Sequence, residues 1–181
     1  MKLMFVSDIH GSAYYCKAAL DKYNEEKCDQ LILLGDLLYH GPRNDLPKEY
    51  NPKLVAKLLN ENKDHLITVR GNCDAEVDQM MLEFPALADY AMLLVDGHRF
   101  YLTHGHHYNK DAMPPLAKND VLCYGHFHVP LAFKQGDNYI FNPSSISLPK
   151  QGTNSYGIYE NHMFTIKTLD GDIVATLKLE D

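Results

Sequence analysis

Three short apolar runs in the first half of the chain each end in a side chain that could bind a metal ion. The runs cover residues 3–6, 31–34 and 66–69, and they are followed by Asp8, Asp36 and Asn72. Unbroken apolar runs of this length are typical of strands that are buried on both faces of a sheet. Helical patterns through Ala18 to Tyr23 and over residues 52–60 lie between the runs. The first half therefore predicts repeated strand, loop and helix units.

The second half is richer in predicted strands, and a short helix through Met81 precedes it. Asp96-Gly97 is a typical two-residue hairpin turn, and it separates apolar runs over 92–95 and 99–103. Further strands are expected over residues 121–124, 131–134, 139–141, 156–159, 163–168 and 173–179. The pattern predicts two sheets packed face to face with helices outside. Because no stretch resembles a linker, residues 1–181 are expected to form a single domain.

Histidines follow two of the later predicted strands, at His104 and at His126-Phe127-His128, and His10 lies beside Asp8. Loops beyond the carboxyl ends of neighbouring strands form the crevice where sites are built, so these side chains should meet there. A mixed carboxylate, amide and imidazole set suits Mn²⁺, Fe²⁺ or Zn²⁺. Seven donors exceed the need of one ion and predict two ions that share a carboxylate. The predicted ligands are Asp8, His10, Asp36, Asn72, His104, His126 and His128.

Each of these motifs is weak evidence for a metal site when it stands alone. Asp8 could cap a helix, and His126 and His128 could be ordinary surface or hydrogen-bonded histidines. Their joint occurrence, in order, after five successive strands favours a metal site over coincidence. Glycines beside the ligands, such as Gly35 and Gly71, are expected where turns pass close to the ions.

Composition limits the partners of the chain. A formal net charge of -7 argues against bulk binding of nucleic acid, since such binders present a basic face. Any anionic substrate must therefore meet local positive charge, which bound metal would supply. Homo-oligomers are compatible with the sequence, and the apolar pattern does not decide the point.

The cysteines and the N-terminal residues indicate the cellular compartment in which the protein is expected. Cys16, Cys28, Cys73 and Cys123 form no CxxC pair, which indicates neither a zinc knuckle nor a disulfide framework. The N-terminal apolar run is too short for a signal peptide or a membrane span. A cytoplasmic location without membrane contact is expected.

Taken together, the motifs resemble the calcineurin-like metallophosphoesterase superfamily. They comprise Asp8-x-His10, Gly35-Asp36, Gly71-Asn72-x-Asp74, His104 and Gly125-His126-x-His128. The stretches His40-Gly41-Pro42-Arg43-Asn44 and Gly71-Asn72-Cys73-Asp74 look more narrowly like the bacterial YfcE-type phosphodiesterases. This resemblance implies an α/β (α+β) fold, a four-layer αββα sandwich of two mixed β-sheets flanked by helices.

The resemblance also implies an assignment of ligands to two divalent metal ions. One ion would take Asp8, His10, Asp36 and His128, and the other Asp36, Asn72, His104 and His126, with Asp36 bridging. Mn²⁺ is the expected metal, with Zn²⁺, Fe²⁺ and Ni²⁺ as alternatives. The implied substrate is a small phosphate ester. The implied reaction is hydrolysis of a phosphodiester by in-line attack of a hydroxide that the two metals activate.

Two positions depart from the superfamily pattern. Many members carry His where this chain has Cys73, which makes Cys73 a candidate catalytic residue. A thiol is a poor replacement for a protonated imidazole as the general acid, so aryl diesters with an acidic leaving group are expected to be cleaved faster than alkyl monoesters. Ser144 stands where relatives tend to have Gly. Arg43 is a candidate for a bidentate grip on phosphate, although it could equally be a surface arginine in a turn. His106 and His107 are further candidates for lining the site.

Other functions stay open on the sequence. The same site could serve a phosphomonoesterase or a cyclic-nucleotide hydrolase, and only substrate profiling would separate them. A protein of this fold could also be a non-catalytic scaffold for protein contacts, as in the retromer cargo-sorting subunit. Retention of all the ligand-type residues favours the enzyme.

Overall fold

The computed structural model describes residues 1–152 and 154–180, and two mixed sheets form its centre. The six-stranded sheet has the order β11-β10-β9-β1-β2-β3, and the five-stranded sheet has the order β4-β5-β6-β8-β7. The strands are β1 Leu3–Val6, β2 Gln30–Leu33, β3 Leu66–Thr68, β4 Tyr90–Val95, β5 His98–Thr103, β6 Val121–Cys123, β7 Pro130–Gln135, β8 Asn138–Pro143, β9 Ser155–Glu160, β10 Met163–Thr168 and β11 Ile173–Lys178. The predicted strands are thus present, with ends that differ by a few residues.

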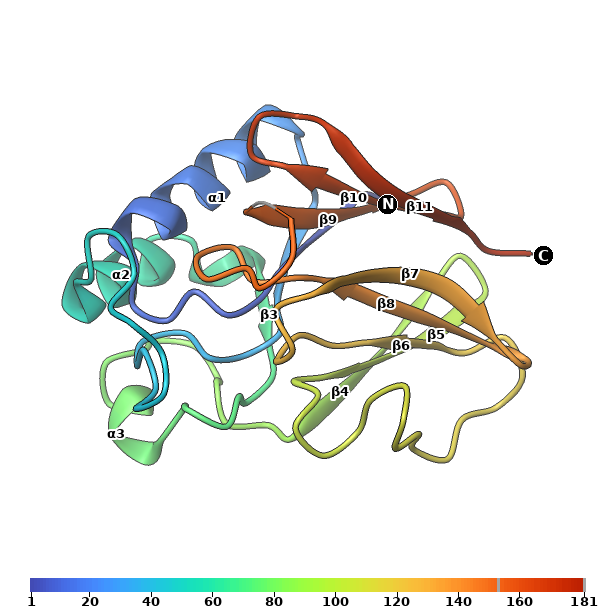
Figure 1. Ribbon diagram of the computed structural model, residues 1–181, viewed down its shortest axis with the longest axis horizontal. Coiled ribbons are helices and arrows are strands. Elements are labelled where there is room, and N and C mark those ends of the chain that lie inside the picture. Colours follow the sequence, from blue (N-terminus) through green and yellow to red (C-terminus); the bar gives the residue numbers. More distant parts are fainter. Residues whose placement is uncertain (153, 181) are drawn as a thin grey trace.

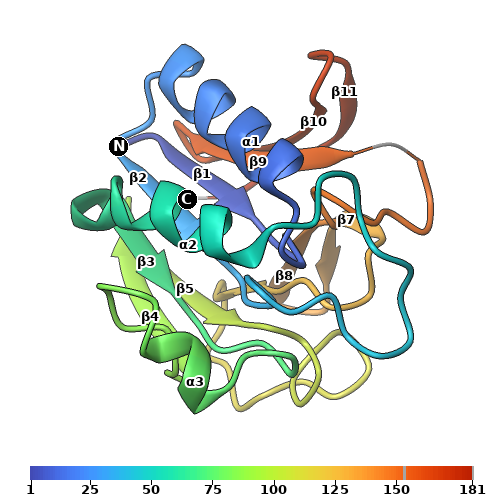
Figure 2. The ribbon, with the colours of Figure 1, turned by 90° about the vertical axis from the view of Figure 1, so that its left-hand side faces the viewer.

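Two helices cover the outer face of the six-stranded sheet. α1 (Ala13–Glu25) lies in front of β1, and α2 (Pro52–Asn60) lies in front of β2 and β3 (Figure 2). Each begins at a side-chain cap, because Ser12 accepts from the backbone N–H of Tyr15 and Asn51 from that of Leu54. A short 3₁₀ helix (Lys63–His65) follows α2. α3 (Glu76–Gln79) is the short helix expected through Met81, and it ends two residues earlier. The 3₁₀ turn was not predicted, since three residues carry no periodic signal.

One hydrophobic core lies between the two sheets, which lie one above the other in Figure 1. Phe5 packs edge-on against Phe141, with ring centroids 5.4 Å apart, and Phe100 packs against Tyr159 at 4.9 Å. Side chains of β1 alternate between this core and the core under the helices: Leu3 and Phe5 face the second sheet, whereas Met4 and Val6 face α1 and α2. Burial on both faces explains the unbroken apolar runs in the sequence.

The sandwich of two mixed sheets is confirmed, but its fourth layer differs from the expectation of flanking helices. In the part of the chain that the structure describes, no helix lies between β5 and β6. Met113 and Leu116, in the irregular segment between these strands, instead pack on the outer face of the five-stranded sheet, against Tyr124 and its neighbours. Prolines at 114 and 115 in this segment disfavour a helix there. None of the helices formed by the described residues is long and apolar enough to cross a membrane.

Candidate metal centre

The predicted ligands come from both sheets and meet where the carboxyl ends of their parallel strands lie together. Asp8 and His10 follow β1, Asp36 follows β2 and Asn72 follows β3, all in the six-stranded sheet. His104 follows β5, and His126 and His128 follow β6, in the five-stranded sheet. β1 to β3 run parallel to one another, as do β5 and β6, so each sheet presents its donors at one edge.

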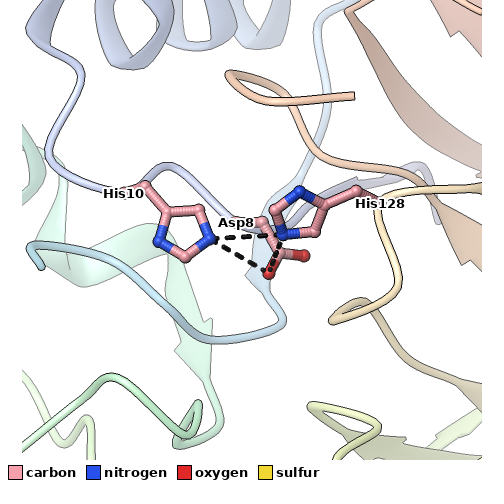
Figure 3. Close-up of side chains that lie close together, drawn as sticks. All are labelled: Asp8, His10 and His128. Carbon is pink, nitrogen blue, oxygen red and sulfur yellow. Dashed lines mark hydrogen bonds and ion pairs between the residues drawn. The ribbon is translucent and has the colours of Figure 1, made fainter. Parts of the chain in front are cut away.

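One carboxylate oxygen of Asp8 is central to the arrangement. Asp8 Oδ2 accepts from the Ser7 hydroxyl at 2.6 Å and from the backbone N–H of His126 at 3.0 Å. Asp8 Oδ1 is buried and accepts no hydrogen bond from the described residues. Instead, it lies 3.2 Å from Nε2 of His128 and 3.6 Å from Nε2 of His10 (Figure 3). A buried carboxylate oxygen that accepts no hydrogen bond lowers the stability of the fold, unless a cation or a hydrogen-bond donor binds it.

Three of the four predicted histidine ligands are oriented by hydrogen bonds to backbone carbonyls through Nδ1. His10 Nδ1 lies 2.9 Å from the carbonyl of Tyr39, His104 Nδ1 2.7 Å from that of Leu34, and His128 Nδ1 2.6 Å from that of Leu148. A carbonyl can only accept, so each Nδ1 carries the proton and each Nε2 keeps its lone pair unless the ring is charged. This is the pattern by which metal-binding imidazoles are held in one tautomer.

The second half of the cluster gathers around Asp36. Its Oδ2 lies 3.3 Å from His104 Nε2, which is also 3.1 Å from Asn72 Oδ1 and 3.2 Å from His126 Nδ1. His10, Asp36 and Cys73 form another close group, because Nε2 of His10 is 3.7 Å from Asp36 Oδ2. Asp36 therefore borders donors on both sides, as a bridging ligand would.

Charge interactions in the cluster oppose the effect of burial. Burial disfavours the charged form of Asp8, but the surrounding histidines hold the pKa of its carboxyl well below its usual range. Burial likewise opposes charge on His104, yet the Asp36 and Asp8 carboxylates raise its pKa to about 9. Burial and the nearby His104 lower the pKa of His126 to about 4. Two buried carboxylates thus create a field that favours cations.

Five of the predicted ligands have a left-handed backbone, which is uncommon for residues other than glycine. They are Asp8, His10, Asp36, His126 and His128, with φ of 56°, 50°, 56°, 63° and 58°. Such conformations cost of order 1 kcal/mol each and persist where the surroundings hold them. They cluster at functional sites, so the strain supports a role for these side chains beyond packing.

Backbone crowding fixes two of the glycines that the sequence placed beside the ligands. A side chain at Gly71 would collide with the carboxylate and backbone of Asp36, and one at Gly125 with the Ser7 hydroxyl. Neither needs a positive φ, so close approach alone requires glycine here. Ser144 does adopt a left-handed φ of 72°, as expected where relatives tend to have glycine.

Three residues outside the predicted ligand set hold the loops after β1, β2 and β3 in place. Asp74 accepts from the backbone N–H groups of Asp36, Leu37 and Gly71 at 2.7–2.8 Å, and so joins the loops after β2 and β3. The Ser145 and Ser147 hydroxyls both donate to the carbonyl of Asp8 at 2.8 Å. The sequence shows Asp74 beside the ligands, but nothing in it predicts that the 142–147 loop reaches Asp8.

A cleft of about 360 Å³ opens over the cluster. Arg43 and Cys73, the two predicted catalytic residues, both line it, together with Phe127 and Lys150. Lys150 was not predicted; its backbone N–H donates to the carbonyl of His128 at 2.9 Å, which places it at the rim. His106 and His107 do not line the cleft, although the His106 ring lies 5.5 Å from that of His104. Burial and the Asp36 carboxylate raise the pKa of the Cys73 thiol to about 12.

Comparisons with known proteins agree with this geometry. The profile of the calcineurin-like phosphoesterase superfamily domain matches residues 1–162. The chain is 46% identical to phosphodiesterase YfcE of Escherichia coli K12 over 181 residues, covering 99% of this chain and 98% of the relative. The solved structure of the E. coli YfcE phosphoesterase superposes with a TM-score of 0.97 at 45% identity, covering 99% of this chain and 100% of that one.

A more distant match shows the fold alone. A crystal structure of a Vps29 single mutant from Entamoeba histolytica has a TM-score of 0.66 at 19% identity, covering 99% of this chain and 100% of that chain. A likeness at this identity carries no functional information, because one fold supports different functions.

Proposed function

Because the chain belongs to the calcineurin-like phosphoesterase superfamily, we propose that it is a metal-dependent phosphodiesterase whose two divalent metal ions are held by the clustered side chains. The observation that carries the metal proposal is the buried Oδ1 of Asp8, which accepts no hydrogen bond from the described residues and faces imidazole nitrogens. Asp8, His10, Asp36 and His128 would hold one ion, and Asp36, Asn72, His104 and His126 the other. The mixed donors suit Mn²⁺, our proposed metal, with Zn²⁺, Fe²⁺ and Ni²⁺ as alternatives.

When bound, two such ions supply a water of lowered pKa as the nucleophile and positive charge for the phosphoryl oxygens. The protein contributes position and charge. Arg43 lines the cleft and offers a planar guanidinium that can donate two hydrogen bonds to one phosphate. Lys150 adds a second cation at the rim. In a chain with a net charge of -7, these side chains would attract an anionic ester to this cleft.

Cys73 supports the preference for diesters with an acidic leaving group. A thiol whose pKa is raised to about 12 stays protonated at neutral pH and gives up its proton poorly. The leaving oxygen would therefore depart as an anion with little help. Aryl diesters meet this need because a phenoxide is a stable leaving group, whereas alkyl monoesters do not.

The test is an activity grid. The purified protein is stripped with a chelator and given Mn²⁺, Zn²⁺, Fe²⁺, Ni²⁺ or Mg²⁺ singly. It is then assayed with bis(4-nitrophenyl) phosphate, with 4-nitrophenyl phosphate and with an alkyl monoester such as glycerol 3-phosphate. We expect metal-restored diester hydrolysis, a lower rate on the alkyl monoester, and loss of activity in Asp36→Asn. The aryl monoester has the same leaving group as the diester, so its rate separates a preference for diesters from a preference for an acidic leaving group. Asp137→Asn, the same substitution at an exposed turn, is the control. A folded protein that is inactive with every metal would contradict the proposal and favour a scaffold.

A homo-oligomer is proposed on the evidence of β4. This edge strand contains no charged residue, and its Tyr90, Met92 and Leu94 side chains are 53%, 49% and 82% exposed. Edge strands are usually protected by charges or prolines, so an apolar edge favours pairing with a second copy. Leu94→Arg should lower the mass measured by light scattering, whereas Leu46→Arg, at an exposed loop leucine, should not. A wild-type protein that is monomeric at all concentrations would contradict this proposal.

We also keep the cytoplasm as the proposed compartment, since the four cysteines are unpaired in the structure. Bulk binding of nucleic acid is not proposed, because the chain is acidic overall.

A further inference from the structure

Phe127 lies between two of the proposed metal ligands and is turned toward solvent. Its backbone N–H donates to the carbonyl of Gly125 at 2.7 Å, and the residues on either side have left-handed backbones. His128 is only 4% exposed, whereas Phe127 is 39% exposed. His126, Phe127 and His128 all line the cleft. The tight turn therefore directs the imidazoles inward and the phenyl ring toward the opening of the cleft.

The ring of Phe127 is held in one orientation by two neighbours. Tyr124 meets it at an interplanar angle of 83° and a centroid distance of 6.1 Å, and His126 meets it at 81° and 5.1 Å. Edge-to-face contacts of this kind are favourable for aromatic rings. A ring already fixed in position loses little conformational freedom when a ligand packs against it.

The rest of the cleft lining explains which ligand would use this ring. Among the described residues that line the cleft, Phe127 is the only aromatic side chain other than the imidazoles. Arg43 and Lys150 offer positive charge to a phosphate in the same cleft. An exposed phenyl ring beside a phosphate site matches a ligand that combines one negative charge with a flat apolar group.

We propose that Phe127 selects phosphodiesters whose retained substituent is an aromatic ring, by stacking or edge contact with that ring. The proposal rests on the proposed phosphodiesterase function and narrows its substrate class. It concerns the group that stays on phosphorus, and is therefore separate from the leaving-group argument based on Cys73.

Two diesters with the same leaving group isolate this contact. Bis(4-nitrophenyl) phosphate retains an aryl group, and methyl 4-nitrophenyl phosphate retains a methyl group. The readout is the ratio of their kcat/KM values with the Mn²⁺-loaded protein. Comparing this ratio between wild type and variants cancels the difference in intrinsic reactivity. We expect Phe127→Ala to lower the ratio about tenfold, and Phe127→Tyr, which keeps the ring, to preserve it. Phe127→Leu keeps apolar bulk without a ring, and should lower the ratio as well.

A binding measurement separates failure of this inference from failure of the proposed function. Phenylphosphonate should raise the Tm of the Mn²⁺-loaded wild type more than methylphosphonate does, and Phe127→Ala should remove the difference. If no diester is hydrolysed by wild type but this difference is seen, the proposed function fails and the ring-binding inference stands. An unchanged ratio in Phe127→Ala, or equal Tm shifts for the two phosphonates in wild type, would overturn the inference.

Discussion

The two sheets contribute different chemistry to the cluster. The six-stranded sheet supplies both carboxylates and the amide, in loops that are bonded to one another: Asp8 N–H donates to Gly35 and His10 N–H to Asp36. The five-stranded sheet supplies only imidazoles, and two of its histidines depend on the other sheet for position. His104 Nδ1 donates to the carbonyl of Leu34, and the backbone N–H of His126 donates to the Asp8 carboxylate. Neither sheet can form the cluster alone.

The ligands of the six-stranded sheet and those of the five-stranded sheet are also held in place in different ways. Hydrogen bonds between the loops after β1 and β2 link the two carboxylate-bearing segments within one sheet, whereas the histidines of the five-stranded sheet depend on contacts between the sheets. The predictions below test that distinction, from the largest expected effect to the smallest.

Removing one donor from either sheet should abolish activity to a similar extent. We expect Asp8→Asn and His104→Asn each to lower kcat/KM for the aryl diester by more than about a hundredfold, since even residues behind metal ligands cost 10–100-fold. Steady-state assays with Mn²⁺, alongside circular dichroism to check folding, provide the measurement. A folded His104→Asn protein with near-normal activity would show that the His104 imidazole is not a required ligand.

Asp74→Asn should weaken the hydrogen bonds that join the loops after β2 and β3. An amide cannot accept all three backbone N–H groups that the buried Asp74 carboxylate accepts, so at least one donor is left unpaired. We expect a loss of about 2 kcal/mol in unfolding free energy and of about tenfold or more in activity.

Asp120→Asn is the matched control, because Asp120 is also buried but binds Arg99, at the opposite ends of β5 and β6 from the site. It should lose stability without a comparable loss of activity. Equal losses of activity in both variants would mean that general destabilisation, and not the loop contact, is responsible.

Metal addition should stabilise the junction between the sheets. A metal present at about a hundred times its Kd would add about 2.7 kcal/mol to the folded state, because the ligands are assembled only there. Chelator should therefore lower the Tm, and Mn²⁺ should restore it. The shift should be absent from Asp36→Asn if both ions depend on that carboxylate. An identical Tm with and without metal in the wild type would contradict the assignment of the site.

A charge network far from the site gives a smaller effect that depends on pH. Glu26, near the end of α1, accepts from Lys167 on β10 and Lys2 before β1. Burial opposes its charge, but these lysines lower the pKa of Glu26 to about 2. A lowered carboxyl pKa stabilises the fold at neutral pH, and this contribution is lost as pH falls from about 4.5 toward 2. We expect Glu26→Gln to cost about 1–2 kcal/mol at pH 7, allowing for partial exposure.

Urea unfolding at several pH values measures this effect. The difference between Glu26→Gln and wild type should shrink as the pH falls, with no change in activity at pH 7. Asp21→Asn, which breaks an exposed pair with Lys17, should cost less than about 0.5 kcal/mol. A Glu26→Gln difference that grows on acidification would show that the sign is wrong.

The sequence by itself determined the strands, the two long helices and which donor-type side chains meet at one edge of the sheets. Burial on both faces requires continuous apolar runs, and those runs are visible at β1 and β2 without any structure. Donor residues placed after parallel strands predict a shared edge, so the clustering of Asp8, Asp36 and His104 could be foreseen.

Only the tertiary structure decided what holds and surrounds the cluster. The contacts of Ser145 and Ser147 with Asp8 span more than a hundred residues, and no local pattern encodes such a distance. The irregular fourth layer, the position of Lys150 at the rim and the exposed face of Phe127 likewise depend on how segments pack. Local periodicity records which face of an element is buried, but the partner on that face is selected by the packing of the whole chain.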